Sequence, residues 1–310
     1  MTSGEQGHLF APWYVVDRPA KRPSGGFVLP RRPSIIPEKQ MSALYTDCWV
    51  AGVDEAGRGP LAGPVFAGAV VFDFQEKRPA GLQDSKQVPE EARQELSLQI
   101  KSKALAWGIG RAEPWEIDRL NILNATRLAA ERALHQASQM LQQKRGSGIG
   151  ALVTDALSLP NFPTPGSPCP QRGLIKGDAR SSSIAAASIL AKVERDACML
   201  ELAELFPEYG WSENKGYPTP DHLNALKANG PCSIHRYSYK PVATALEQHS
   251  VVRRSPGFQT WKEALEGATF TTLPFLPVEE YRYLASEYDG VFSEFVKKNT
   301  NFPLEFPLLP

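Results

Sequence analysis

The order of local patterns along the chain predicts an α/β layer fold. Short apolar runs with the length of β-strands alternate with longer segments whose apolar residues recur at helical spacing. The 310 residues are 42% hydrophobic and 22% charged, which is typical of a globular protein that buries a substantial core. Strands that alternate with helices in this way pack as a sheet covered by helices.

The first half of the pattern begins with residues 48–74, which we expect to form a strand, a tight turn and a β-hairpin. Pro89, Glu90 and Glu91 suit the first turn of a helix, which should run to about Ser102. A strand over residues 104–111 follows. One long helix is then expected to begin at Pro114 and to end at Gly146.

The second half repeats the alternation. Residues 150–155 are the next expected strand, and a Pro-rich loop over 159–170 separates them from the short segment 174–178. A helix rich in Ala and Ser should extend from 181 to about 205. An irregular loop over 210–220 and a short helix over 221–229 complete the series.

Composition excludes several classes of protein. No apolar run approaches the ~20 residues that a membrane span needs, and no basic and apolar leader opens the chain, so we expect a cytoplasmic protein. The four cysteines are too scattered for a zinc motif and are expected to be reduced. The net charge of zero neither supports nor excludes a nucleic-acid partner, because the local distribution of charge decides that question.

Acidic residues recur where apolar segments end. Asp54 and Glu55 end the first expected strand, and Asp155 and Asp178 end two later segments. In open α/β sheets ligands gather at strand ends, so these carboxylates can converge. Converging carboxylates raise one another's pKa unless a cation binds them, and oxygen-only ligands select Mg²⁺ or Mn²⁺ over Zn²⁺. The small residues Gly57 and Gly59 beyond the acids leave backbone N–H groups open to an anionic ligand, which indicates a metal site beside a phosphate backbone.

The chain resembles a known family, ribonuclease HII, the type 2 ribonuclease H. The resemblance covers roughly residues 46–245 through collinear motifs. These are the segments 51–65, 84–86 (Asp-Ser-Lys), 121–126, 176–178 (Lys-Gly-Asp), 186–196, 214–219, 230–231 (Gly-Pro) and 235–236 (His-Arg).

The resemblance implies a ribonuclease H-like fold, with a central mixed sheet, flanking helices and a helical C-terminal portion. It implies an endoribonuclease that cleaves the RNA strand of RNA–DNA hybrids and the 5′ side of single ribonucleotides embedded in duplex DNA. The reaction expected is two-metal-ion hydrolysis that leaves 3′-OH and 5′-phosphate ends, with two Mn²⁺ or Mg²⁺ ions. The partner is the nucleic acid, no membrane is involved, and the protein is expected to be a monomer.

Carried over by motif, Asp54, Glu55, Asp155 and Asp178 are the catalytic and metal-binding acids. The predicted nucleic-acid contacts are Gly57, Arg58 and Gly59 at the ribonucleotide, Tyr217 stacked on the adjoining sugar, and Ser85, Lys86, Asn124 and Lys192 at phosphates. Ala156 stands where the family has glycine, which is the main departure from the pattern. His222 and His235 are expected to be structural and hydrogen-bonded, because a two-metal reaction needs no histidine nucleophile.

The expected domains are a disordered basic arm over residues 1–45, a ribonuclease H-like catalytic domain over 46–250, and an aromatic and Pro-rich extension of unknown role over 251–310.

Four alternatives stay open from the residues alone. A single strand-end acid is often a turn or helix cap, and Tyr217 could be a core aromatic. The chain could be an inactive hybrid-binding module. A carboxylate pair could also serve a glycoside hydrolase, although adjacent acids on a strand point to opposite faces.

Overall fold

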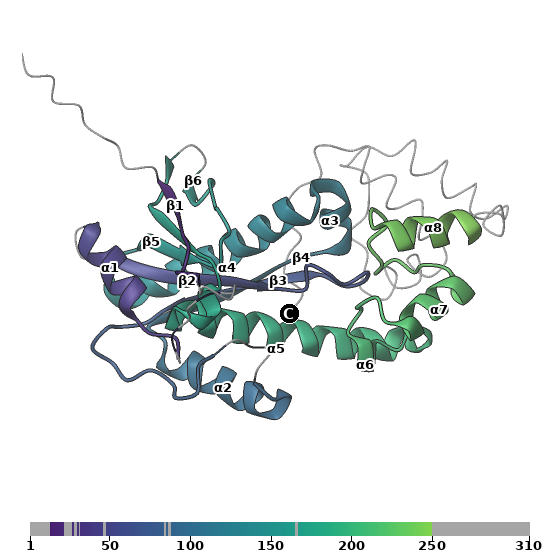
Figure 1. The fold of residues 1–310 in the computed structure, drawn as a ribbon, viewed down its shortest axis with the longest axis horizontal. Helices are drawn as coiled ribbons and strands as arrows, with labels where there is room; N and C mark the ends of the chain where they lie inside the picture. Colours follow the sequence, from purple (N-terminus) through teal and green to yellow (C-terminus); the bar gives the residue numbers. More distant parts are fainter. Residues whose placement is uncertain are drawn as a thin grey trace, which may run out of the picture. The chain divides into compact units, whose positions relative to one another are not determined.

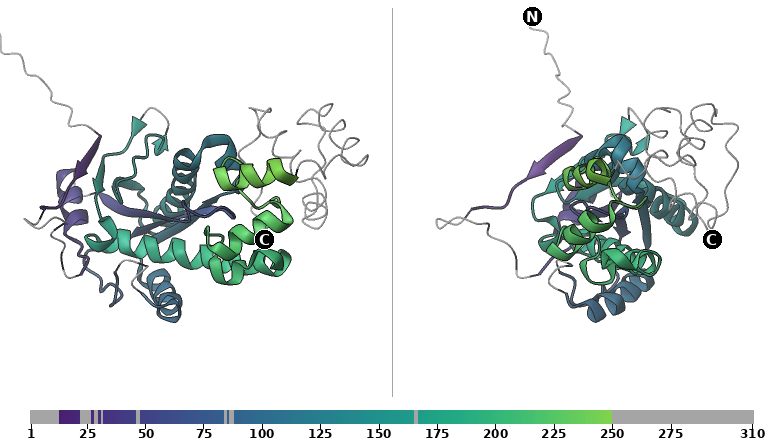
Figure 2. Two further views of the ribbon diagram at one scale, coloured as in Figure 1. Left: turned by 45° about the vertical axis from the view of Figure 1, so that its right-hand side comes forward. Right: turned by 90° about the vertical axis from the view of Figure 1, so that its right-hand side faces the viewer.

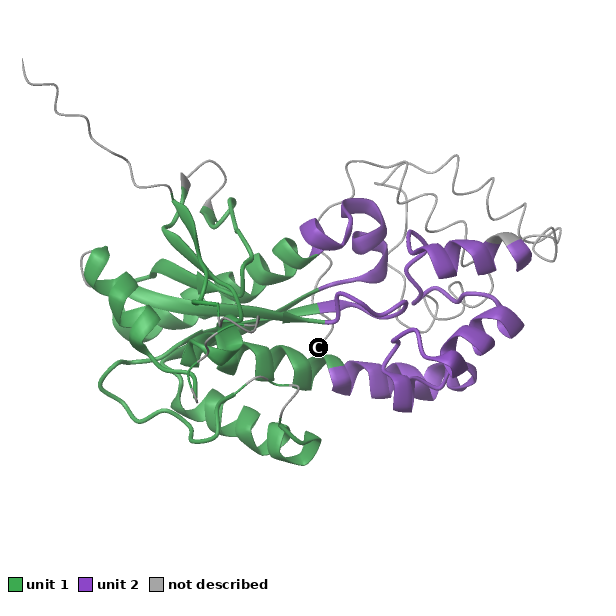
Figure 3. Ribbon diagram, viewed as in Figure 1, with its two compact units in different colours: residues 1–56, 66–111, 126–195 green, residues 57–65, 112–125, 196–310 purple. Residues whose placement is uncertain are grey.

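The computed structural model describes residues 13–21, 27, 30, 32–45, 48–83, 85, 88–164 and 167–249. They belong to two compact units, each built from separate stretches of chain (Figure 3). The first unit takes residues 1–56, 66–111 and 126–195, and the second takes 57–65, 112–125 and 196–310. The region expected to be one catalytic domain therefore contributes to both units, and the division of the chain at residues 45 and 250 stays a prediction.

The first unit is built on a six-stranded mixed sheet with the order β1-β8-β5-β2-β3-β4. The strands are β1 (Tyr14–Asp17), β2 (Trp49–Ala56), β3 (Val65–Val71), β4 (Ala106–Ala112), β5 (Ile149–Thr154) and β8 (Gln171–Leu174). The four adjacent strands β1, β8, β5 and β2 run parallel to one another, whereas β3 is antiparallel to β2. This architecture confirms the predicted α/β fold with a mixed sheet.

Helix α5 (Ser182–Leu205) lies along one face of this sheet (Figure 1). The approach is close because glycines face it: a Cβ on Gly52 would lie 2.3 Å from the carbonyl carbon of Ser183, and one on Gly68 would lie 2.4 Å from the carbonyl oxygen of Ala187. Helix α2 (Glu90–Lys103) contributes Leu96 to an apolar cluster that also contains Ala185 to Ala187 of α5. Small residues thus bring α5 against β2 and β3, next to the strand end that carries Asp54.

Two further helices complete the first unit. Helix α4 (Ile122–Arg145) runs beside β4, where Gln136 accepts a hydrogen bond from the N–H of Ile109 and Arg132 donates to the carbonyl of Arg111. Helix α1 (Ile36–Leu44) packs Met41 into a cluster with β2, β5 and β8. A short hairpin, β6 (Pro163–Thr164) and β7 (Ser167–Pro168), lies within the Pro-rich loop.

The expectation of a disordered arm over residues 1–45 is wrong for the residues described there. Residues 14–17 form β1, an edge strand parallel to β8, and residues 36–44 form α1 (Figure 2). The physical reason is tertiary: β8 supplies the hydrogen bonds that a lone four-residue strand lacks, and the sheet covers the buried face of α1. Residues 1–12 lie outside the described part of the chain.

The expected single helix from Pro114 to Gly146 is also wrong, because the chain forms two helices here. Helix α3 (Pro114–Leu120) ends at Asn121, whose φ of 66° is left-handed. The side-chain oxygen of Asn121 accepts hydrogen bonds from the N–H groups of Leu123 and Asn124, which start α4. Asparagine tolerates this conformation and caps helices well, so it separates two segments whose apolar periodicity is continuous.

The second unit is helical, as the sequence predicts for the C-terminal portion. It contains α3, the end of α5, the 3₁₀ turn η3 (Pro207–Tyr209), α6 (Trp211–Asn214), α7 (Pro220–Asn229) and α8 (Lys240–His249). Two apolar clusters hold it, one around Leu226 and Val242 and the other around Trp211 and Met199. None of the described helices has both the length and the apolar character that a bilayer span needs. The extension over residues 251–310 lies outside the described residues.

Candidate active site

The sheet topology brings the predicted acids to one edge of the first unit. Asp54 is near the end of β2, Asp155 directly follows β5, and Asp178 lies in the 3₁₀ turn η2 (Gly177–Ala179) that follows β8. Because β2, β5 and β8 run parallel, their carboxyl ends share an edge, which is where ligands bind in open α/β sheets.

Asp54 shows how strongly the acids act on one another. Its side chain is buried in the sheet, and burial raises its pKa well above the ordinary range. The negative charges of Glu55 and Asp155, and more weakly of Asp178, raise it further. Four carboxylates from three strand ends therefore share one electrostatic environment. The reading of each acid as an isolated cap does not explain this convergence.

Backbone donors orient these carboxylates. The N–H of Glu55 donates to Oδ1 of Asp54 at 2.8 Å, and the N–H of Ala179 donates to Oδ1 of Asp178 at 2.9 Å. The N–H of Gly177 donates to Oδ1 of Asp155 at 2.9 Å, which ties the β8–α5 loop to the end of β5. Gly177 packs closely here: a Cβ would lie 2.8 Å from Cδ1 of Ile184 and 3.2 Å from Cα of Asp155, so a larger residue would require both neighbours to shift.

The donor set fits a hard divalent cation. All four groups are carboxylates, which suit Mg²⁺ or Mn²⁺, and a cation among them would offset both the burial and the mutual repulsion of Asp54. Within the described residues, no three His, Cys, Asp or Glu side chains already stand close enough together to hold a metal ion. The carboxylates are thus gathered at one edge, and sharing an ion requires side-chain rotation to bring them together.

Ala156, which replaces the family glycine after Asp155, adopts the conformation that glycine favours. Its φ is 55°, in the left-handed region where a Cβ costs about 1–2 kcal/mol. The turn after β5 is therefore kept despite the substitution, and Asp155 keeps its place beside Asp54 at this strand end.

The glycine loop that follows β2 belongs to the second unit, where a buried arginine holds it. Arg236 donates from Nη2 to the carbonyl of Gly57 at 2.6 Å, from Nη1 to that of Arg58 at 3.0 Å, and from Nε to that of Gly63 at 2.9 Å. The residues Arg58 and Gly59 remain exposed. Sequence reasoning missed this role of Arg236, although a His-Arg pair among the matched motifs was the available signal.

Tyr217 lies against the same loop. It is 39% exposed, so it is not a core aromatic, and a Cβ on Gly59 would lie 3.7 Å from its ring. The structure therefore brings together, within the second unit, the glycine loop and the aromatic residue that were predicted to contact the sugar.

The backbone of Tyr217 is held by a buried chain of hydrogen bonds. His222 Nδ1 is 2.9 Å from the Tyr217 carbonyl, which can only accept, so Nδ1 carries the proton. His222 Nε2 then accepts from Trp211 Nε1 and from His235 Nε2, each at 3.1 Å. His235 Nδ1 in turn accepts from the N–H of Cys232 at 3.0 Å. Both rings are thus neutral, which confirms the predicted structural role of the two histidines.

The predicted phosphate contacts are scattered. Asn124 is exposed at the start of α4 and Lys192 is half-buried on α5. Ser85 is buried and accepts a hydrogen bond from Ser188, a position that favours an internal role. Lys86 lies outside the described residues.

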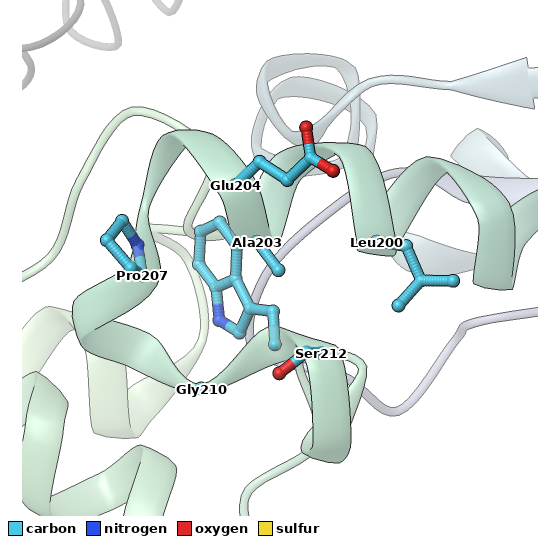
Figure 4. A pocket seen from close by; sticks show the side chains of 7 residues that line it. Leu200, Ala203, Glu204, Pro207, Gly210 and Ser212 are labelled. Carbon is cyan, nitrogen blue, oxygen red and sulfur yellow. The ribbon is translucent and has the colours of Figure 1, made fainter.

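A pocket of about 400 Å³ also lies in the second unit (Figure 4). It is lined by Leu200, Ala203, Glu204, Pro207, Gly210, Trp211 and Ser212. It contains none of the predicted site residues, and its single carboxylate offers no acid pair, so we assign it no part in the chemistry.

Comparisons with known proteins agree with this site. The family described as Ribonuclease HII matches residues 51–242. A Ribonuclease HII of Nitrosococcus oceani is 50% identical over 198 residues, which cover 64% of this chain and 92% of that protein. One from Desulfitobacterium hafniense is 49% identical over 198 residues, covering 64% of this chain and 71% of the relative.

A solved structure supports the fold independently. The ribonuclease H2 of Pyrococcus horikoshii OT3 superposes with a TM-score of 0.51 at 25% identity, over 65% of this chain and 99% of that one. The chain belongs to the ribonuclease HII family and is a metal-dependent ribonuclease H, a hydrolase that cuts within nucleic-acid strands.

Proposed function

We propose that the protein cleaves the RNA strand of RNA–DNA hybrids and the 5′ side of single ribonucleotides embedded in duplex DNA. The observation that carries the proposal is the buried Asp54, whose pKa is raised by burial and by three neighbouring carboxylates at one sheet edge. A buried carboxylate among other carboxylates is costly to keep ionised unless a bound cation offsets their charge.

Asp54, Glu55, Asp155 and Asp178 are the residues that would hold two Mg²⁺ or Mn²⁺ ions. When bound, such a pair of ions activates the attacking water and stabilises the departing oxygen of a phosphodiester. The carboxylates supply the negative charge that retains the ions, and the backbone donors on Asp155 and Asp178 keep those side chains oriented. Water adds to phosphorus, the bond to the 3′-oxygen breaks, and the products carry 3′-OH and 5′-phosphate ends.

Recognition of the ribonucleotide is proposed for the loop Gly57-Arg58-Gly59 and for Tyr217. The 2′-OH distinguishes RNA from DNA at a single nucleotide, and small residues let backbone groups approach it. Arg236 supports this role because it binds the loop through carbonyl oxygens, which fixes the loop without using its N–H donors. The exposed ring of Tyr217 suits stacking on a deoxyribose that carries no 2′-hydroxyl.

The test is cleavage mapping on a duplex with one embedded ribonucleotide, with and without Mn²⁺ or Mg²⁺. The parent should cut once, on the 5′ side, and only with the ion. Asp54→Asn should lower the rate by about a thousandfold or more, roughly 4 kcal/mol, and should not lower the melting temperature, since it removes a repelling charge. Asp73→Asn is the matched control outside the cluster.

Two results would overturn the proposal. Undiminished cutting by Asp54→Asn in Mg²⁺ would remove Asp54 from the metal site. Binding of the duplex without any cleavage by the parent would instead indicate the inactive binding module.

A further inference from the structure

The N-terminal segment 14–44 contacts the loop that carries Asp178 through three of its described residues, Asp17, Ser34 and Glu38. This segment precedes the residues that match the family, which begin at 51. From it, we propose that Asp17, Ser34 and Glu38 are positioning residues that fix the Asp178 loop and thereby set the affinity for the divalent ion. The proposal rests on the metal-binding role proposed for Asp178.

The first contact is made by Asp17, at the end of β1. Its carboxylate Oδ2 accepts from Arg172 at 2.6 Å and from Arg180 at 3.1 Å, and its carbonyl accepts a second bond from Arg180 at 3.0 Å. The carbonyl of Asp17 also accepts from the N–H of Ile175 at 3.1 Å. Asp17 therefore binds the loop on both sides of Asp178.

The second contact is made by Ser34, just before α1. Its N–H donates to the carbonyl of Arg180 at 3.1 Å, and its carbonyl accepts from the N–H of Ser182 at 2.9 Å. These two bonds form a parallel bridge across Ser181, where the loop enters α5. The loop thus gains strand-like pairing with Ser34 at the point where it enters α5.

The third contact is Glu38 of α1, which is fully buried. Its Oε1 accepts from the hydroxyl of Ser181 at 2.7 Å and from the N–H of Ser183 at 2.9 Å. Ser181 itself accepts from the N–H of Ile184. A carboxylate at the first turn of α5 stabilises the helix start through these orphan donors and the helix dipole. Glu38 therefore fixes the position at which the Asp178 loop ends.

The three contacts act on a short span. All of the bonds made by Asp17, Ser34 and Glu38 to this region go to residues 172–183, and Asp178 lies within this span. Groups that hydrogen-bond a metal ligand typically change metal affinity 10–100-fold when removed, and contacts that act through the ligand's neighbours are expected at the lower end of that range. The N-terminal segment holds Asp178 through its neighbours, since the contacts above all go to residues around it.

The experiment measures Mn²⁺ binding to the full-length protein by isothermal titration calorimetry, without substrate. Asp17→Ala should weaken Mn²⁺ binding about tenfold. Asp73→Ala is the matched control, because Asp73 forms a comparable ion pair with Arg145 at 2.9 Å and has no contact with the loop. It should leave the affinity unchanged. If Asp17→Ala does not fold, as judged by circular dichroism, Asp17→Asn replaces it and should give a smaller loss of the same sign.

A double-mutant cycle separates positioning from general destabilisation. In an Asp178→Asn background, Asp17→Ala should cause no further loss of Mn²⁺ affinity, because its effect passes through the missing carboxylate. An equal loss in both backgrounds, or no loss in the parent beyond that of Asp73→Ala, would overturn the positioning role. If Asp178→Asn alone leaves Mn²⁺ binding intact, the metal role of Asp178 has failed instead, which is a separate result.

Discussion

Acidification should destabilise this protein through His235. The ring is fully buried, and burial lowers its pKa from the ordinary value of 6.5 to about 3, with a further contribution from the neighbouring His222. In the unfolded chain the same ring takes up a proton near pH 6.5. The stability that the neutral ring contributes is therefore fully present above pH 6.5 and is lost as the pH falls toward about 3.

The size of the effect follows from the two pKa values. Between about pH 7.5 and pH 5, the unfolded state gains protonation at this site while the folded state does not. With each pKa unit equal to about 1.4 kcal/mol, the loss at pH 5 is about 2 kcal/mol. Protonation would also break the network, because His235 Nδ1 accepts from Cys232 and could no longer do so.

The assay is urea unfolding at about pH 7.5, 6 and 5 for the parent and for His235→Gln. The variant should be less stable at pH 7.5, because it loses the acceptor for Cys232, yet its stability should fall about 2 kcal/mol less on going to pH 5. The other titratable groups that contact the ring, His222, Tyr209 and Cys232, are present in both proteins. Parallel pH profiles for the two proteins would refute the reasoning.

Two more substitutions test the loop and the turn. Arg236→Lys keeps the charge but cannot reach three carbonyls at once, so unfolding should be easier by about 3 kcal/mol and the substrate KM should rise more than kcat falls. Arg132→Lys is its control, because the half-buried Arg132 donates to the carbonyl of Arg111 outside the glycine loop, and an equal loss there would contradict the role of Arg236. Ala156→Gly relieves a left-handed alanine and should raise the free energy of unfolding by roughly 0.5–1 kcal/mol. Ala197→Gly on α5 should lower it by about 1 kcal/mol, and a loss in both variants would show that Ala156 is unstrained.

The sequence predicted those parts of the fold whose signals are local. The strand ends at Asp54 and Asp155 and the small-residue helix α5 were expected from apolar runs and periodicity, and the structure places them as expected. The family resemblance was confirmed by the comparisons. The metal-binding and nucleic-acid roles of individual residues stay predictions.

The parts that sequence reasoning missed depend on distant partners. The segment 14–17 has β-prone residues in Tyr14, Val15 and Val16, but four residues do not form a stable strand alone. It is ordered by β8, 155 residues further along the chain at the Asp17–Arg172 pair. The apolar periodicity continues past Asn121, but the positive φ of this one residue ends α3 and separates it from α4. The hydrogen bond from Arg236 to the carbonyl of Gly57 joins residues 179 positions apart, and the His-Arg pair in the sequence does not show which distant partner the arginine binds.

The three acid-bearing strand ends share one backbone device that links fold to chemistry. Gly57 with a φ of 96° follows Glu55 by two residues, Ala156 with 55° follows Asp155, and Lys176 with 58° precedes Asp178 by two. A left-handed residue turns the chain sharply at each point where a strand stops. Two of the three are not glycine, so each costs about 1–2 kcal/mol, and such strain persists where the surroundings over-determine it. Here the surroundings are the hydrogen bond from the N–H of Gly177 to Asp155 and the contacts that Asp17, Ser34 and Glu38 make around Asp178. Contacts around the carboxylates therefore offset the backbone strain of bringing them together. For the Asp178 loop, these contacts come from residues that precede the family match.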